Sequence, residues 1–215
     1  MSHRRITAVA LGSALAASLA LPASAAAASE NRLGNRSLAA VLTSDGNTFD
    51  RNWNDYDIVT EAVLAVIAND SDGNSPVRLL ADGSVALTAF VPSDLAFRNL
   101  VQSLTGKRLD TEQKVFAAAA GLGLETVEAV LLYHVIPGAT ITKAMAVKAN
   151  GANLTTALGS TVGVRVYNRA VPVIELRDKD MNAANAFVNP FATDLNKGNR
   201  QIAHGITAVL RPVDL

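Results

Sequence analysis

The order of helix-like and strand-like patterns along the chain limits its fold more than any other feature. Before Pro137-Gly138 the apolar residues recur with helical spacing; in the segment that begins at Asp57 they occupy positions i, i+1, i+4 and i+5. After Pro137-Gly138 the pattern becomes strand-like. The expected strands cover residues 140–148, 152–158, 161–168, 171–178 and 201–210. This segregation predicts an α+β fold in which helices, mainly in the first half, pack on a β-rich second half.

One strand is expected inside the helical half of the chain. Residues 85–91 are almost all apolar, which is typical of a buried strand. The residues that follow break this strand, and Ser93 or Asp94 is expected to satisfy the free N–H groups of the next helix. Further helices are predicted after Thr111 and from about residue 125 to 135.

The N-terminus has the pattern of an export signal. Arg4-Arg5 precedes an apolar run from Ile6 to Leu21, and small residues follow, which predicts a secretory signal peptide over residues 1–25. The alternative is a membrane anchor, but a run of about 16 residues is shorter than the roughly 20 that a spanning helix needs. Residues 26–36 are then expected to form a flexible arm and residues 37–215 a single domain. The mature chain is expected to be secreted, extracellular or at the cell surface, without a membrane span.

The composition excludes several classes of function. The chain has no Cys, which excludes disulfides, zinc–thiolate sites and a Cys nucleophile. Its 19 basic residues are balanced by 19 acidic ones, so nucleic acid is not an expected partner. Catalytic motifs and metal-ligand spacings are absent, and only His134 and His204 remain after removal of the signal peptide. The chain is therefore expected to be non-enzymatic, without a metal or a cofactor.

Three segments, in this order and spacing, resemble the signatures of the fasciclin domain family. Residues 88–97 read Thr-Ala-Phe-Val-Pro-Ser-Asp-Leu-Ala-Phe, similar to the first signature, Thr-Val-Phe-Ala-Pro-Thr-(Asp/Asn)-x-Ala-Phe. Residues 131–138 read Leu-Leu-Tyr-His-Val-Ile-Pro-Gly and resemble the central Tyr-His segment. Residues 202–212 read Ile-Ala-His-Gly-Ile-Thr-Ala-Val-Leu-Arg-Pro and resemble the closing signature. The resemblance implies a fasciclin-like fold.

The resemblance also implies which residues to consider first. Fasciclin relatives act as extracellular adhesion modules, and the Tyr-His segment is implicated in adhesion in some of them. By resemblance the interaction residues here are Tyr133 and His134, with Leu132 and Val135 as apolar neighbours. The alternative is structural, with Tyr133 in the core and His134 bonded to a backbone group. The structural signature residues are Thr88, Phe90, Pro92, Ser93, Asp94, Phe97 and His204.

Three functions follow as hypotheses. The first is a secreted, non-enzymatic module for adhesion, with an extracellular protein or a matrix or cell-surface component as partner. The second is a secreted carrier of a small apolar ligand such as a pigment or lipid, because an Ala/Val-rich helical half against strands can leave an apolar cleft. The third is a hydrolase whose site has no recognisable motif.

Overall fold

The computed structural model describes residues 33–44, 46–168 and 171–214. The predicted signal peptide and residues 26–32 of the predicted arm lie outside this part of the chain. Within the described residues, no individual helix is both long enough and apolar enough to cross a membrane. The helices α4 (Glu112–Ala120) and α5 (Leu124–Tyr133) meet that criterion only when they are taken together, and the chain bends by 103° between them.

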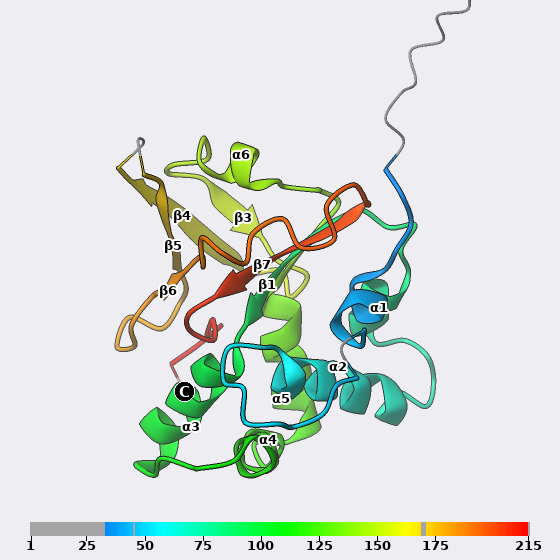
Figure 1. Ribbon diagram of the computed structural model, residues 1–215, viewed down its shortest axis with the longest axis vertical. Helices are drawn as coiled ribbons and strands as arrows, with labels where there is room; N and C mark the ends of the chain where they lie inside the picture. Colours follow the sequence, from blue (N-terminus) through cyan, green and yellow to red (C-terminus); the bar gives the residue numbers. More distant parts are fainter. Residues whose placement is uncertain (1–32, 45, 169–170, 215) are drawn as a thin grey trace, which may run out of the picture. The chain divides into compact units, whose positions relative to one another are not determined.

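Most helices lie in the first half of the chain and most strands in the second, as the sequence pattern predicts (Figure 1). The other helices are α1 (Leu38–Leu42), α2 (Asp57–Asn69), the 3-10 helix η1 (Pro76–Ala81), α3 (Asp94–Thr105) and α6 (Lys143–Ala146). The strands are β1 (Leu87–Pro92), β2 (Val135–Pro137), β3 (Asn153–Thr155), β4 (Thr161–Tyr167), β5 (Val173–Arg177), β6 (Ala186–Phe187) and β7 (Gln201–Ile206). The α+β class is confirmed.

The strands form two sheets. In the first, the order is β2-β1-β7, with β1 antiparallel to β2 and parallel to β7. In the second, β3-β4-β5-β6, every neighbouring pair is antiparallel. The central strand β1 therefore lies beside the last strand of the chain, so the first and closing signature segments are side by side.

Two clusters of apolar side chains lie on opposite faces of the three-stranded sheet. They explain why the sequence around β1 is almost entirely apolar. On one face of β1, Leu87, Ala89 and Val91 pack into the cluster that includes α2, α3 and α5. On the opposite face, Phe90 packs into the cluster formed with β4 and β5. Since both faces of β1 are covered, every one of its residues is buried.

The prediction of a strand over residues 140–148 is wrong. Residues 143–146 form the short helix α6, and none of its side chains is buried. The Thr142 side chain accepts a hydrogen bond from the Met145 N–H, and the Asp194 carboxylate accepts one from the Lys143 N–H at 2.7 Å. These acceptors satisfy N–H groups that begin a helical turn.

The described end of the predicted arm is attached to the domain. The Gly34 N–H donates to the Gly198 carbonyl at 2.8 Å, and the Arg200 N–H donates to the Gly34 carbonyl at 2.9 Å. The Arg36 N–H donates to the Asn199 side chain. Residues 33–36 thus continue the hydrogen bonding of the segment that leads into β7.

Candidate functional site

The predicted interaction segment lies at the junction of α5 and β2, in the interior. Leu132, Tyr133, His134 and Val135 are all buried. Leu132 and Val135 belong to the apolar cluster on the helical side, whereas Tyr133 belongs to the cluster between the sheets. The segment therefore joins the two clusters, and none of these four side chains is exposed to solvent. A direct role of the segment in adhesion stays a prediction.

Tyr133 is completely buried, but its hydroxyl is satisfied. Its O–H donates to the backbone carbonyl of Thr161, the first residue of β4, at 2.9 Å. Burial and the nearby Asp178 raise the pKa of Tyr133 to about 12. The ring fills the core and the hydroxyl ties the end of α5 to the four-stranded sheet.

His134 uses both of its ring nitrogens inside the protein. The Leu210 N–H donates to Nε2 at 2.9 Å, which places the ring proton on Nδ1, and Nδ1 donates to the Val130 carbonyl at 2.7 Å. Burial lowers the pKa of His134 to about 4, so the ring is neutral at physiological pH. This ring fastens the chain's C-terminal segment to α5.

His204 in β7 is engaged in the same way. The Asp194 N–H donates to Nδ1 at 3.3 Å, and Nε2 lies 2.8 Å from the Ile141 carbonyl. Burial lowers the pKa of His204. Neither His134 nor His204 keeps a free ring nitrogen for proton transfer or metal ligation, so the geometry of both fits a structural role.

The first signature segment also acts through packing. Thr88 in β1 donates from its hydroxyl to the Ala139 carbonyl at 2.7 Å and accepts from the Ile141 N–H at 2.8 Å. Phe90 and Phe97 are buried on opposite sides of β1, and Pro92 ends the strand opposite Ile206. These contacts hold the strand-to-helix junction in place.

Asp94 caps a different helix from the one expected. The structure shows no cap hydrogen bond from the Ser93 side chain at the start of α3. The Asp94 carboxylate instead accepts the Ile58 N–H, in the first turn of α2, at 3.0 Å. Asp94 thereby connects the N-termini of α2 and α3.

The four-stranded sheet has one face that packs on the core and one face that points away from it. This second face carries aromatic and charged side chains. Strand alternation directs Val162, Val164 and Val166 towards the interior and places Arg165 and Tyr167 on the opposite face. The outer face of this sheet is defined here as the following residues of β4, β5 and β6: Arg165, Tyr167, Val173, Glu175, Arg177 and Phe187. Tyr167, Val173 and Phe187 are exposed by 37%, 43% and 38%.

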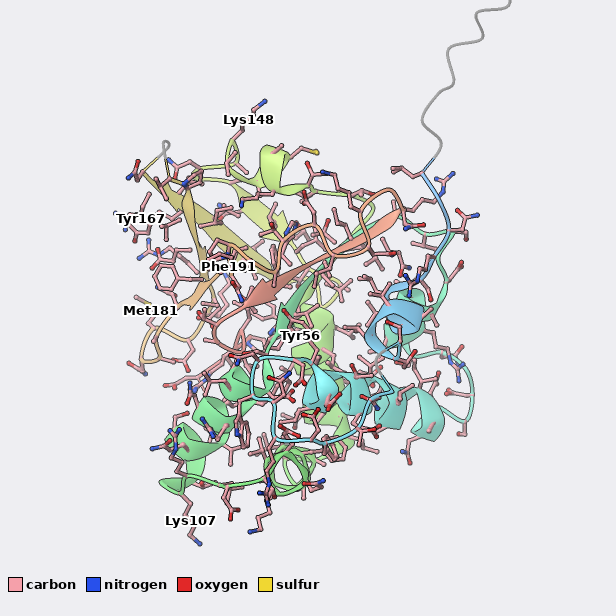
Figure 2. The ribbon with its side chains drawn as sticks, in the orientation of Figure 1. Tyr56, Lys107, Lys148, Tyr167, Met181 and Phe191 are labelled. Carbon is pink, nitrogen blue, oxygen red and sulfur yellow. The ribbon has the colours of Figure 1, made fainter. Side chains whose placement is uncertain are left out.

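Polar contacts order this outer face. Glu175 accepts a hydrogen bond from the Tyr167 hydroxyl at 3.0 Å, and Arg177 lies 3.8 Å away from the same carboxylate. The Arg165 guanidinium lies over the Tyr167 ring, 4.7 Å from its centroid. Figure 2 shows Tyr167 beside β4, at the edge of the molecule. These contacts hold the aromatic and charged groups in position, and Tyr167 stays partly exposed.

The sequence analysis did not single out this face, because no signature segment includes Tyr167 or Phe187. The signal was available in residues 161–167, Thr-Val-Gly-Val-Arg-Val-Tyr, where Val alternates with the outward residues. The cross-strand partners could not be predicted from the sequence. Tyr167 pairs with Val173 and Glu175 pairs with Phe187 because of the register of the folded sheet.

An apolar cavity lies among α2, α3, α4 and α5. Its volume is about 40 Å³, and its walls include Ile58, Phe97, Leu100, Phe116, Leu122 and Leu124. Leu122, in the turn after α4, and Leu124, the first residue of α5, are exposed and lie on the solvent side of the cavity. A smaller apolar cavity of about 20 Å³ lies beside the strands, with Phe90, Leu154 and Val164 among its lining residues. The expected cleft is one between helices and strands, so the cavity among the helices matches it only in being apolar.

Comparisons with known proteins point to one family. A model of the fasciclin domain matches residues 63–212. Among solved structures, the chain is similar to a FAS1 domain pair from the insect cell adhesion molecule fasciclin I, with 17% sequence identity and a TM-score of 0.46. That match covers 70% of this chain and 44% of the other, so this chain spans less than half of it. No curated protein matches.

Proposed function

This chain belongs to the fasciclin domain family, and from that we propose that it is an extracellular, non-enzymatic module that binds proteins through the outer face of its four-stranded sheet. Domains of this family are typically extracellular or on the cell surface, and they mediate protein interactions. The predicted signal peptide supports secretion, and the engaged nitrogens of both described histidines support the absence of catalysis.

The observation that carries this proposal is the composition of the outer face. Tyr, Phe and Arg are enriched at protein interfaces because they contribute a large contact area together with polar groups at their ends. Here the Tyr167 hydroxyl is already held by Glu175. The Phe187 main chain is fixed by two hydrogen bonds of 3.0 Å, because its N–H donates to the Thr207 hydroxyl and its carbonyl accepts the Thr207 N–H. Binding would therefore cost little additional side-chain entropy at Tyr167, and Phe187 is presented on a main chain that is already fixed.

The Tyr133-His134 segment lies on the buried side of the four-stranded sheet and stabilises the strand that carries part of the outer face. Tyr133 bonds to Thr161 at the start of β4, and β4 contributes Arg165 and Tyr167 to the outer face. We propose that substitutions in the Tyr133-His134 segment weaken adhesion by destabilising the fold, whereas substitutions on the outer face weaken it directly.

The double substitution Tyr167→Ser with Phe187→Ser tests this surface. We expect it to lower the affinity for extracellular partners at least tenfold, since two aromatic interface contacts of about 1 kcal/mol or more each together exceed that factor. The measurement is the adhesion of cells of the source organism to the immobilised mature protein, with circular dichroism to verify folding. Leu64→Ser in α2 is the matched control, because Leu64 is equally exposed at 37%. Undiminished adhesion of the double variant, or an equal loss in the control, would refute the assignment.

The second candidate function, a carrier of a small apolar ligand, is favoured by the larger of these two apolar cavities, the one among α2–α5. Its 40 Å³ is well below the roughly 150 Å³ that accommodates benzene and the 300 Å³ or more of typical ligand pockets. A pigment or lipid would need α4 and α5 to separate at Leu122 and Leu124.

Native mass spectrometry of the protein, purified from its own secretion medium, distinguishes the two candidates. We expect the mass of the mature chain alone, because the cavity is too small for a pigment. A mass excess that disappears on denaturation would favour the carrier.

A further inference from the structure

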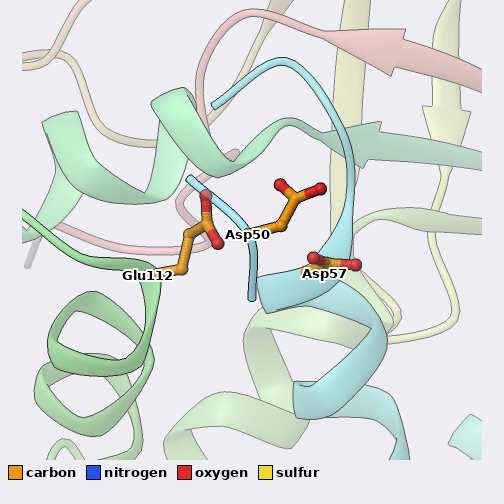
Figure 3. Close-up of side chains that lie close together, drawn as sticks. All are labelled: Asp50, Asp57 and Glu112. Carbon is orange, nitrogen blue, oxygen red and sulfur yellow. The ribbon is translucent and has the colours of Figure 1, made fainter. Parts of the chain in front are cut away.

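Five carboxylates gather where three helices begin. Asp57, Asp94 and Glu112 are the first residues of α2, α3 and α4, and Asp50 and Asp55 come from the loop before α2. Oxygens of Asp50, Asp57 and Glu112 lie within 4.8 Å of one another, as do oxygens of Asp55, Asp94 and Glu112. Figure 3 shows the first of these groups between the starts of α2 and α4. These five residues are called the carboxylate cluster below.

Helix ends and backbone N–H groups explain part of this arrangement. Acidic side chains are favourable in the first turn of a helix, where the macrodipole is positive. In addition, one oxygen of Asp94 accepts the Ile58 N–H, and one oxygen of Glu112 accepts the Arg51 N–H at 3.0 Å. Each of these two carboxylates therefore has one oxygen satisfied by the protein.

The remaining oxygens are not satisfied. Asp55 Oδ1, Asp94 Oδ2 and Glu112 Oε1 are buried and have no hydrogen-bond partner. Asp94 and Glu112 are 0% exposed. Across residues 33–44, 46–168 and 171–214, no Lys, Arg or His forms an ion pair with any of these three. A buried carboxylate without a counter-charge is strongly unfavourable, so the charge of this cluster has to be neutralised by a cation or by a proton.

We propose that the carboxylate cluster is a Ca²⁺-binding site whose central ligands are Asp55, Asp94 and Glu112. Carboxylate oxygens without nitrogen or sulfur ligands select hard cations. Ca²⁺ accepts six to eight oxygens in irregular geometry, whereas Mg²⁺ requires a near-ideal octahedron. The side chains come from three helix starts and a loop, which favours the more tolerant ion. A bound Ca²⁺ would fasten α2, α3 and α4 together.

The competing explanation is a proton. Burial raises the pKa of Asp94 to about 8, and Asp55 adjoins it, so a proton held between the two carboxyl groups would also relieve the repulsion. A proton-only cluster would leave Glu112 Oε1 without a partner and would not respond to added Ca²⁺. The two explanations therefore differ in a direct binding measurement.

The experiment is a titration of the chelator-treated mature protein with CaCl₂ at constant ionic strength, followed by calorimetry and by thermal unfolding. We expect saturable binding with a Kd between about 10⁻⁶ and 10⁻³ M. At a hundredfold excess of Ca²⁺ over Kd, we expect Tm to rise by about 5 °C or more. MgCl₂ is expected to bind more weakly. No saturable binding together with an unchanged Tm would overturn the proposal and favour the proton.

Matched variants identify the ligands. Glu112→Gln and Asp55→Asn preserve side-chain size and are each expected to weaken Ca²⁺ binding at least tenfold. Asp55 is only partly buried, so its variant remains informative even if Glu112→Gln fails to fold. The control is Asp110→Asn, since Asp110 precedes the same helix but is exposed and paired with Lys114. Wild-type affinity in Asp55→Asn, or an equal loss in Asp110→Asn, would contradict the assigned ligands.

Discussion

Tyr133→Ala is expected to lower the free energy of unfolding by about 3–5 kcal/mol, which is the usual cost of removing a buried aromatic ring. The ring is 0% exposed and packs with Ile136, Val162 and Leu176 between the two sheets. The substitution leaves a cavity at the junction of both sheets and breaks the hydrogen bond to Thr161. Denaturant unfolding followed by circular dichroism measures the change.

Two further variants separate the ring from its hydroxyl and from exposed aromatics. Tyr133→Phe keeps the ring and leaves the Thr161 carbonyl without this donor, so a loss of only about 1 kcal/mol is expected. Tyr167→Ala removes a Tyr on the outer face and is expected to cost less than Tyr133→Ala, because that ring is only partly covered. If Tyr133→Ala were within 1 kcal/mol of wild type, the buried position of this residue would be wrong.

His134 is expected to make the protein less stable in acid. The unfolded chain takes up a proton at this ring near pH 6.5, but the folded protein does so only near pH 4. Between these values the unfolded state binds more protons, so stability falls as the pH drops from about 6.5 to about 4 and is then constant. A shift of this size corresponds to about 3 kcal/mol, of which about 2 kcal/mol is lost by pH 5.

The difference between wild type and His134→Gln isolates this effect. A raw pH profile is insufficient because Asp94, whose pKa burial raises to about 8, contributes stability that increases as the pH falls. The Gln side chain can accept the Leu210 N–H but does not titrate. We expect His134→Gln to be less stable than wild type at pH 7.5 and to approach wild type at pH 5. A difference that stays constant between these pH values would show that the His134 pKa is not lowered.

Substitutions of Tyr133 and His134 are therefore expected to act mainly on the stability of the fold. This changes how adhesion experiments on these two residues are interpreted. A loss of binding after Tyr133→Ala or His134→Ala reports first on unfolding. The outer-face variants do not have this ambiguity, because Tyr167 and Phe187 are partly exposed. Comparing the buried-residue variants with the outer-face variants in one adhesion assay distinguishes two effects. The first set reports on stability of the fold, and the second reports on direct contact with the partner.

Local patterns in the sequence were sufficient for the class of the fold and for its family. The helical spacing from Asp57 predicts α2, the apolar run over residues 85–91 predicts β1, and the three signature segments resemble the family that residues 63–212 match. These features depend on neighbours within a few residues, so periodicity and capping residues reveal them. The strand expected over residues 140–148 is wrong because Thr142 and Asp194 together start a helical turn there, and Asp194 is distant in sequence.

Which polar and aromatic residues face the solvent, and which meet in the interior, depends on contacts that no local pattern reveals. Tyr133 and Tyr167 are the same residue type, yet one is enclosed by two sheets and the other lies on an outer face. Asp94 follows a strand like an ordinary helix cap, but it accepts an N–H from α2 and lies beside Asp55 and Glu112. The physical reason is that burial, pKa and the gathering of carboxylates depend on contacts between distant segments, which form only when the helices and sheets pack.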